Sequence, residues 1–486
     1  MRKQDEPYTA QVTPDPEAQP AGAAGAAGAP EKALDPEASD QYNLPIWRKY
    51  IILFVVSWMT LAITFSSTSF LPATPEIASE FNTTTEILNA TNAGVLLAMG
   101  FSSLIWGPLG NIFGRKYAYN VAIFVLTGCS AGAAAAINMR MFTTMRVLAG
   151  LTGTSFMVSG QTILADIFEP VVRGTAVGFF MVGSVAGPAI GPCIGGIIVT
   201  FTSWRIIFWV QTAMAGFGLV LSLLFISGVQ DPPTMIAKKK AGAKVGALDM
   251  VAMFNPLRII RQMVYPNVFL ADLTCGFLAT FQYALLTSAR ALFNPRFNLT
   301  TALVSGLFYL APGSGFLLGS VIGGKLSDRT VRKWIARRNG VRLPQDRLNS
   351  GLLTLLGVLP VSALIFGWTL QEEAGGMVVP IISAFFGGFG LTGSFNGLNT
   401  YNAAEAIPAK RSEVIAGKYI VQYIFAAAST AAVQPLLDAI GAGWTFTICV
   451  VLSLIGGLLV WTITKWGFDM QQWAERKFEL DKKPGF

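Results

Sequence analysis

Apolar stretches of helix length recur along the chain, and short polar segments separate them. Twelve such stretches have at least about 20 residues, the length that a helix needs to cross ~30 Å of hydrocarbon at 1.5 Å per residue. They cover residues 50–72, 88–109, 118–138, 141–167, 174–200, 204–228, 267–293, 301–324, 351–371, 376–402, 413–438 and 443–466. The pattern predicts an all-α membrane protein with twelve transmembrane helices.

The longest polar segments set the expected domain boundaries. Residues 1–45 are rich in Pro, Ala, Gly and Glu and have no apolar core, so we expect a disordered cytoplasmic tail and no cleavable signal peptide. Residues 229–266 divide the helices six and six, which predicts two pseudo-symmetric six-helix bundles over residues 46–228 and 267–466. Residues 467–486 are expected to form a cytoplasmic C-terminal tail, and the chain is expected to be a monomer.

Composition and charge agree with a membrane protein. Hydrophobic residues make up 52% of the chain and charged residues 13%, against about a quarter in soluble domains. The formal net charge of +8 would suit nucleic acid, but the basic residues form short clusters beside the apolar stretches. Most clusters follow even-numbered helices, so the positive-inside rule predicts that both termini are cytoplasmic. We therefore expect contact with membrane lipid and none with nucleic acid.

The chain lacks the residue patterns of common catalytic and metal sites. It has no histidine, and its four cysteines lie inside apolar stretches without CxxC spacing, so we expect neither a zinc site nor a disulfide framework. We find no nucleophile with a neighbouring base and no phosphate loop, which argues against an enzyme and against a cofactor. Sequons in segments expected on the outer side give three candidate glycosylation sites, Asn82, Asn89 and Asn298.

Two decapeptides share Gly, Leu, Arg and Lys in the same register. GPLGNIFGRK begins at Gly107 and GKLSDRTVRK at Gly324, and each follows the second helix of its half. The second copy has Asp328 and Arg329, whereas the first has Asn111 in place of the acid. The match predicts duplicated halves with equivalent cytoplasmic loops.

The fifth apolar stretch contains the motif GSVAGPAIGPCIGG. Its glycines would form a groove for close packing of another helix, and its prolines would kink the helix by removing backbone donors. Glycine packing alone explains the groove but not two Gly-Pro steps four residues apart. The motif residues are Gly183, Gly187, Pro188, Gly191, Pro192, Gly195 and Gly196.

These motifs resemble those of the major facilitator superfamily. Its loop signature, G-x-L-x-D-R-x-G-R-K, is matched after the second helix except at the acid, and MRVLAGLTGTSF resembles its helix-4 motif. The helix-5 motif resembles that of the family's twelve-helix antiporter branch, usually drug and metabolite exporters. The resemblance implies a secondary transporter built from two six-helix bundles.

The resemblance also implies that charged groups near the first decapeptide stabilise one access state. Because Asn111 is not an acid, we expect Arg115 to pair with Asp166 or Glu169, and the alternative is that Arg115 and Lys116 only anchor the loop at the membrane surface. The residues assigned to this gate are Gly107, Asn111, Gly114, Arg115, Lys116, Asp166, Glu169, Arg173, Asp328, Arg329 and Arg332.

Few polar side chains lie inside the predicted helices, and acids are rarer there than bases. Arg146, Arg290 and Lys418 could bind a small carboxylate through charge-assisted hydrogen bonds, or could instead extend toward the membrane surface. The acids within the spans, Asp166 and Asp272, lie near helix ends, whereas a carrier of cationic drugs would gain from an acid at mid-membrane depth. We expect the substrate site to contain Arg146, Gln161, Gln282, Tyr283, Arg290, Asn396, Lys418, Tyr419 and Gln422.

Longer stretches are similar to the fungal itaconate exporters. Among them are VVSWMTLAITFSSTSFLP, GLTGTSFMVSGQTILADIFEPVVRGTAVGFF and GKYIVQYIFAA. The similarity covers nearly everything from Pro45 to the last helix. It implies a plasma-membrane protein that moves a small unsaturated dicarboxylate out of the cell.

We therefore expect a transporter that exports itaconate by alternating access. Without a histidine or a central carboxylate no proton path is evident, so proton antiport and facilitated efflux both stay open. A proton-coupled multidrug or secondary-metabolite efflux pump of the same fold is one alternative, which the helix-5 motif favours. A transporter-like sensor that binds without flux is the other.

Overall fold

The computed structural model describes residues 44–168, 170–226, 246–252, 254–297, 306–339, 343–402, 407 and 411–478, and nearly all of them are helical. The elements of the first half are α2 (Ile46–Thr68), η1 (Leu71–Ala73), α3 (Thr74–Glu80), α4 (Thr85–Phe113), α5 (Arg115–Ala134), α6 (Met139–Gly150), α7 (Gly153–Ile167), α8 (Pro170–Phe201) and α9 (Arg205–Phe225). Those of the second half are α11 (Ala247–Ala252), α12 (Leu257–Ile260), η3 (Arg261–Val264), α13 (Pro266–Phe297), α15 (Leu310–Arg337), η4 (Pro344–Gly351), η5 (Thr354–Val358), α16 (Leu359–Gln371), α17 (Val378–Thr400) and α18 (Arg411–Phe478).

Helices suited to a membrane dominate the described part of the chain. Eleven helical stretches there are long and apolar enough to cross a bilayer. The last of them, Ser412–Phe478, turns at Gly441, where φ is +79°, so it contains two of the predicted spans. Glycine adopts this positive φ readily because it has no Cβ. The protein is thus an all-α membrane protein with the predicted number of long helices.

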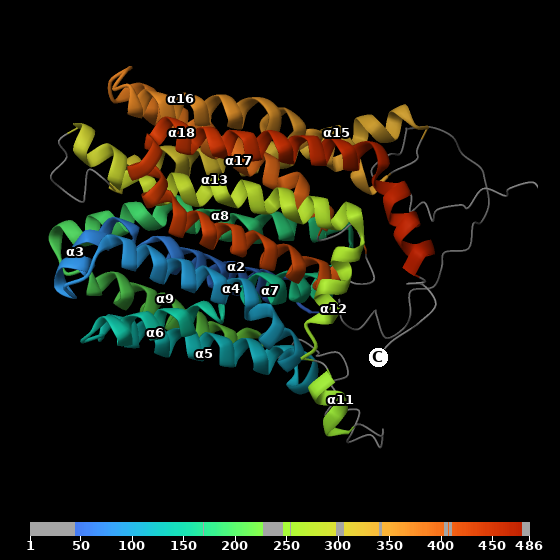
Figure 1. Ribbon diagram of the computed structural model, residues 1–486. Coiled ribbons are helices and arrows are strands. Elements are labelled where there is room, and N and C mark those ends of the chain that lie inside the picture. Colours follow the sequence, from blue (N-terminus) through green and yellow to red (C-terminus); the bar gives the residue numbers. More distant parts are fainter. Residues whose placement is uncertain are drawn as a thin grey trace, which may run out of the picture.

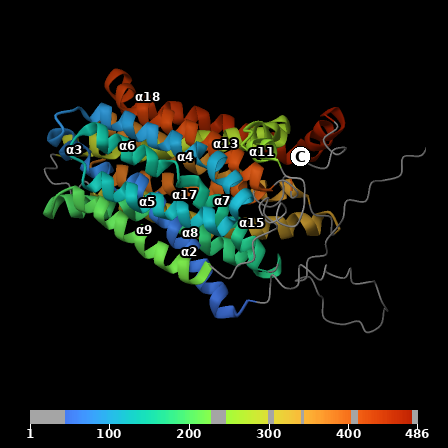
Figure 2. The ribbon, with the colours of Figure 1, turned by 90° about the horizontal axis from the view of Figure 1, so that it is seen from below.

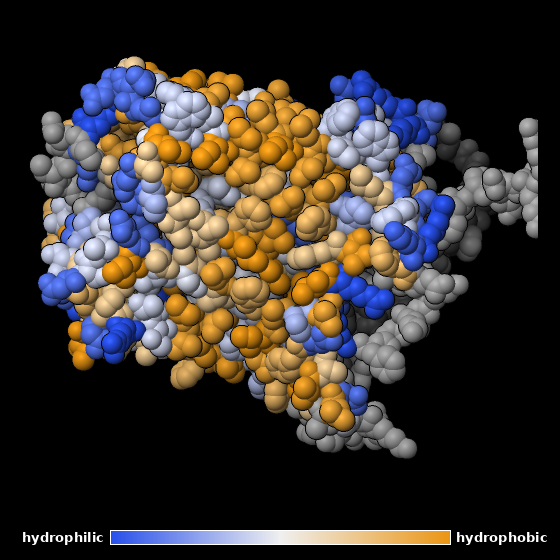
Figure 3. All heavy atoms as spheres, viewed as in Figure 1, coloured by the Kyte–Doolittle hydropathy of each residue, from blue (hydrophilic) through white to orange (hydrophobic). Residues whose placement is uncertain are grey.

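An apolar belt lies between two polar ends on one face of the molecule. Apolar side chains cover the middle of the face shown in Figure 3, and polar side chains gather at both ends of the helices. Large apolar residues such as Phe124 and Leu458 are 68% and 61% exposed. Soluble proteins rarely expose large continuous apolar patches to water. Lipid hydrocarbon is itself apolar and can cover such a patch. The belt therefore marks the surface that faces the membrane.

The helices of the two halves form two groups that lie side by side (Figures 1 and 2). In Figure 1, α4, α5, α6 and α9 lie below, α13, α15, α16 and α17 lie above, and the first part of α18 runs between the two groups beside α4. The groups meet where α4 contacts α18 and where α8 contacts α15. A Cβ built on Gly313 of α15 would lie 2.5 Å from the carbonyl oxygen of Ala189 on α8, so the backbones approach closely at the second of these contacts. The exact domain boundaries given above remain predictions.

Four glycines of the helix-5 motif, Gly183, Gly187, Gly191 and Gly195, lie on the face of α8 that packs against α2 and the residue after it. A Cβ on Gly187 would lie 2.1 Å from Oγ1 of Thr64, and one on Gly195 would lie 1.7 Å from the carbonyl oxygen of Ser69. The Thr64 hydroxyl also donates to the carbonyl of Gly183 at 3.4 Å. In lipid, where the hydrophobic effect does not drive helices together, such close approach supplies the packing energy.

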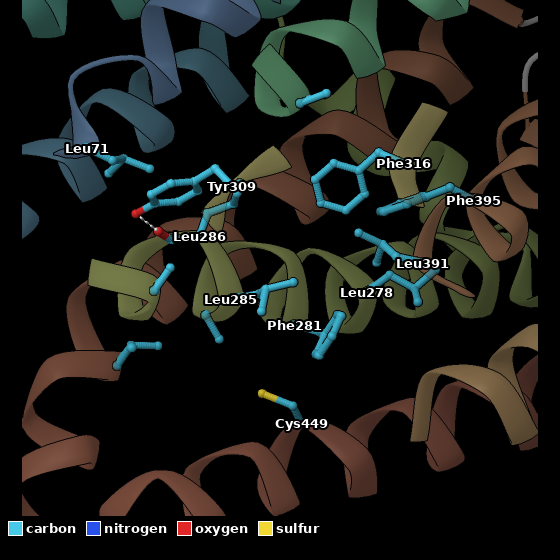
Figure 4. Close-up of a cluster of buried hydrophobic side chains, with 14 of the residues drawn as sticks. Leu71, Leu278, Phe281, Leu285, Leu286, Tyr309, Phe316, Leu391, Phe395 and Cys449 are labelled. Carbon is cyan, nitrogen blue, oxygen red and sulfur yellow. Dashed lines mark hydrogen bonds between the residues drawn. The ribbon is translucent and has the colours of Figure 1, made fainter. Parts of the chain in front are cut away.

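A cluster of apolar side chains lies in the core of the second half. Phe281 and Leu278 on α13 face Leu391 and Phe395 on α17 across the cluster in Figure 4. The Tyr309 hydroxyl is buried there, and it donates a hydrogen bond of 2.8 Å to the carbonyl of Leu286. A buried phenol needs such a partner because an unpaired hydroxyl is costly in an apolar interior.

One local expectation from the sequence was wrong. The decapeptides are mainly helical rather than loops: the first lies in α4 up to Phe113 and breaks at Gly114, and the second lies wholly inside α15. The fourth predicted helix is present as the span Met139–Leu164, with a short break between α6 and α7 that Gly150 and Gly153 flank. Glycine is a poor helix former, so the interruption falls where the helix is weakest.

Candidate functional site

A cavity lies between the two groups of helices and receives residues from both. Its volume is about 70 Å³, enough for several waters at the ~10–15 Å³ that each needs. The first half contributes Thr64, Ser67, Met157, Met181, Ser184, Val185 and Pro188. The second half contributes Gln282, Tyr283, Phe316, Thr392, Phe395, Asn396, Asn399, Lys418, Tyr419, Gln422 and Tyr423.

Lys418 is the one charged residue among the described residues that line this cavity. Its side chain is buried, and Nζ donates to Oδ1 of Asn399 at 2.9 Å. Nζ also lies 3.5 Å from the centre of the Tyr419 ring, which adds a cation–π contact. A lysine held in this way keeps donor capacity, because an ammonium group has three N–H bonds.

Three asparagines follow one another at intervals of three residues along α17 and just beyond it. Asn396 donates to the carbonyl of Ser320 at 2.7 Å, and Asn399 accepts from Lys418. Asn402 donates to Oδ1 of Asp272 at 2.8 Å. Because residues three apart share a helix face, this row connects the cavity to a buried acid on α13.

Other cavity groups combine aromatic surface with hydrogen-bonding capacity. Tyr419 and Tyr423 lie one turn apart on α18, with ring centres 6.3 Å apart. The side-chain oxygen of Gln422 is buried and has no hydrogen-bond partner. The rings of Phe316 and Phe395, visible in Figure 4, form an apolar wall. A small organic molecule with a negative charge and an apolar part fits this lining chemically.

The structure brings together six of the nine residues predicted for the substrate site. These are Gln282, Tyr283, Asn396, Lys418, Tyr419 and Gln422. Gln161 is buried but does not line the cavity, and neither does Arg146. The side chain of Arg290 lies outside the described part of the structure.

Arg146 lies in a separate, smaller cavity inside the first half. It is 4% exposed, so it does not extend to the membrane surface. Its guanidinium stacks on the ring of Phe70 at 3.7 Å and donates to Oδ1 of Asn92 at 3.0 Å. Within the described part of the chain, Nε and Nη1 of Arg146 have no hydrogen-bond partner. Neighbouring rings of Phe142 and Phe208 lie 5.8 and 5.6 Å away, so aromatic faces rather than an acid surround this charge.

The residues assigned to the gate are only partly described. Asp328 accepts a hydrogen bond of 2.8 Å from Arg347, which lies on η4, and Arg329 and Arg332 are exposed on α15. Glu169 and the side chains of Asp166 and Arg173 lie outside the described part of the structure. The pairing of Arg115 with Asp166 or Glu169 therefore stays a prediction.

The three sequons differ in their surroundings. Asn82 is exposed in the turn between α3 and α4, with φ of +49°. Asn89 lies inside α4 and is 8% exposed, so a glycan has little room there. Asn298 lies outside the described residues. Asn82 is thus the better of the two described candidates for glycosylation.

Sequence reasoning missed several residues that the fold places at or near the cavity. Asp272 was set aside as an acid near a helix end, and Asn399, Asn402 and Tyr423 were not assigned to the site. Helical spacing would have found the last three, because each lies three or four residues from a predicted site residue or from another of them. Contact between Asn402 and Asp272 joins two helices distant in sequence, and no local pattern indicates it.

A family model matches most of the chain and agrees with the fold. The model for the Major Facilitator Superfamily matches residues 56–419. The chain belongs to this superfamily. Membership makes it a transporter and not an enzyme.

Among curated relatives, the MFS antiporter QDR3 of Candida albicans is 23% identical over 89% of this chain and 80% of its own length. The efflux pump radE of Floropilus chiversii is 25% identical over 86% and 83%. Among solved structures, the human organic anion transporter MFSD10 has a TM-score of 0.66 at 15% identity, and the match covers 86% of this chain and all of that one. The last comparison shows that the fold is shared.

Proposed function

We propose that this transporter exports a small dicarboxylate, with itaconate as the leading candidate, across the plasma membrane by alternating access around the cavity. The observation that carries the proposal is the lining: one cation, Lys418, stands among amides, hydroxyls and aromatic rings, and no acid is among the described lining residues. An ammonium–carboxylate hydrogen bond in a buried site contributes about 1.5–3 kcal/mol.

The cavity also offers partners for the second carboxyl group of itaconate and for its carbon skeleton. Amide groups of Gln282 and Gln422 and the hydroxyl of Tyr283 offer neutral donors, and Phe316 and Phe395 offer apolar surface. A cationic drug would place its charge beside Lys418 with no acid to compensate among these residues, which costs energy in a buried site. The composition of the cavity therefore supports an anionic substrate.

The experiment is counterflow of labelled itaconate into proteoliposomes that contain the purified protein. We expect uptake driven by internal unlabelled itaconate, competition by other small dicarboxylates and little competition by cationic drugs. Lys418→Met should weaken itaconate affinity by roughly 10- to 150-fold, the equivalent of ~1.5–3 kcal/mol. Lys465→Met is the matched control, because Lys465 lies on the same α18 but is exposed and outside the cavity.

Two results would count against this function. Absence of itaconate counterflow in protein that is folded and reconstituted would exclude itaconate. An equal loss of itaconate affinity in the Lys418→Met and Lys465→Met variants would show that the charge acts at the membrane surface and not in the cavity.

A secondary-metabolite or drug efflux pump is the second candidate. The names of the relatives favour it, since one is called an antiporter and another an efflux pump. Under this alternative a bulky neutral metabolite or drug, and not itaconate, would compete for transport. Deletion of the gene in a producing strain would then increase sensitivity to that compound and leave acid secretion unchanged.

A further inference from the structure

The smaller cavity, which contains Arg146, lies where five helices of the first half meet. Residues of α2, α4, α5, α6 and α9 line it. Its volume is about 10 Å³, room for one particle of roughly the size of a water molecule. Ser67 is the one described lining residue that it shares with the central cavity. The smaller cavity is therefore a site of its own, and the proposed transport mechanism does not use it.

The guanidinium of Arg146 has unused hydrogen-bond donors in this cavity. Nη2 donates to Asn92, whereas Nε and Nη1, which carry one and two N–H bonds, have no partner among the described residues. The contact with Phe70 does not use these bonds, because the ring covers the flat face of the guanidinium and its N–H bonds lie along the edge. The amide nitrogen of Asn92 is likewise buried without a partner among the described residues. Unused donors therefore surround this buried charge.

No negative charge compensates for Arg146 within the part of the chain that the structure describes. None of the described lining residues is an acid, and Arg146 forms no salt bridge with another described residue. The side-chain oxygen of Gln211 in the wall already accepts a hydrogen bond of 2.9 Å from Ser66. Aromatic faces recover only part of the hydration that a buried charge loses. A neutral water molecule would accept the free N–H bonds and still leave the charge without compensation.

We propose that this cavity binds one small monovalent anion, with chloride as the probe, through Nε and Nη1 of Arg146. Such an ion accepts charge-assisted hydrogen bonds and cancels the charge where water does not screen it. Ser130 in the wall adds a hydroxyl that can donate as well. The volume restricts the ligand to a small ion, and the flexible side chain of Met99 in the wall can make way for one slightly larger than water. A dicarboxylate does not fit.

A bound anion should stabilise the helix packing of the first half. The cavity exists only when the five helices are assembled, so the anion binds the folded state and not the unfolded chain. A ligand of this kind raises the melting temperature, and the rise continues with the logarithm of its concentration above the dissociation constant. The inference does not depend on the identity of the transported substrate, because Arg146 does not line the central cavity.

The first test follows thermal unfolding of the purified protein while chloride replaces gluconate at constant ionic strength. We expect the melting temperature of the wild type to rise with chloride and that of Arg146→Met to stay constant, whereas the two proteins should differ little in gluconate alone. Arg140→Met is the matched control, because Arg140 lies on the same α6 but is exposed, and it should respond as the wild type does. Sulfate is too large for the cavity, so any effect it has should be equal in the wild type and Arg146→Met.

The second test locates the ion. Crystals of the wild type that contain bromide, a chloride analogue with strong anomalous scattering, should show a peak within hydrogen-bonding distance of Nε or Nη1 of Arg146. Crystals of Arg146→Met should show none there. Addition of itaconate should leave the wild-type peak in place, because the dicarboxylate binds elsewhere.

The outcomes separate a built site from accidental binding. A chloride response that persists in Arg146→Met, or a wild-type cavity that contains only water, overturns the inference. A bromide peak without any effect of chloride on melting would show an adventitious ion only, and it overturns the inference too. Arg146→Gln replaces the methionine variant if that variant does not fold, and the wild-type bromide map decides if neither folds.

Discussion

The two decapeptides are similar in sequence and different in structure, and one position explains the difference. Gly114 in the first copy adopts φ of +113° and ends α4, so that α5 begins at Arg115. The second copy has Val331 in that register, and α15 continues to Arg337. A β-branched residue resists positive φ, whereas glycine accepts it. Duplicated motifs therefore need not form equivalent loops.

The halves differ in how they bury charge more than in how they pack helices. Glycines of α8 let the backbone of α2 approach closely, and in the second half a Cβ on Gly315 or Gly388 would likewise lie 2.1 or 2.3 Å from a backbone oxygen of the facing helix. Aromatic rings surround Arg146 in the first half. Lys418 in the second half lines the central cavity. Close glycine packing is therefore common to both halves, whereas the second half provides most of the polar cavity groups.

The largest effect should come from filling the glycine groove. Gly195→Ala would place a methyl group 1.7 Å from a backbone oxygen of Ser69, so α2 and α8 must separate, at a cost of about 3 kcal/mol or more. Gly276→Ala meets a side-chain ring at 2.6 Å, and that ring can turn, so about 1 kcal/mol is expected. Thermal unfolding of both purified variants measures the difference. Equal losses would show that a clash with a backbone oxygen costs no more than a clash with a side-chain ring.

A somewhat smaller effect is expected at the break between α4 and α5. Gly114→Val forces a β-branched residue to positive φ, which costs about 1–3 kcal/mol. Gly107→Ala is the control within the same decapeptide, because nothing lies within 4 Å of the added Cβ and alanine favours helix. We expect a lower melting temperature only for the valine variant. An unchanged melting temperature of Gly114→Val would mean that the first decapeptide can continue as a helix, as the second decapeptide does.

Replacing Arg146 should separate stability from transport. Arg146→Met removes two nitrogens without partners but also the cation–π contact and the bond to Asn92, so the free energy of unfolding should change by less than about 2 kcal/mol. Itaconate affinity, measured by counterflow, should stay within about twofold of the wild type because Arg146 does not line the cavity. A tenfold loss of affinity would place both buried cations in the transport site.

The smallest effect should come from the acid retained in the second decapeptide. Asp328 is largely exposed, so its ion pair with Arg347 contributes at most about 1 kcal/mol and less at high salt. Asp328→Asn should therefore leave the melting temperature nearly unchanged, and a change in transport rate at constant affinity would assign the pair to gating. Loss of substrate affinity would contradict a role confined to the gate.

The sequence alone determined the helical membrane fold, because hydrocarbon demands long apolar helices and their length is visible in the pattern of residues. It also indicated six of the eighteen described cavity residues, since a polar side chain inside a membrane helix is costly and therefore conspicuous, as at Lys418 and Asn396. Tertiary structure decided the rest. The rotation of a helix against its neighbours decides whether its buried cation faces a cavity or a cage of aromatic rings. For this reason Lys418 faces the cavity and Arg146 faces aromatic rings. The position of Asp272 beside the turn that carries Lys418 arises from packing of α13 against α18, a contact between distant segments that no local pattern encodes.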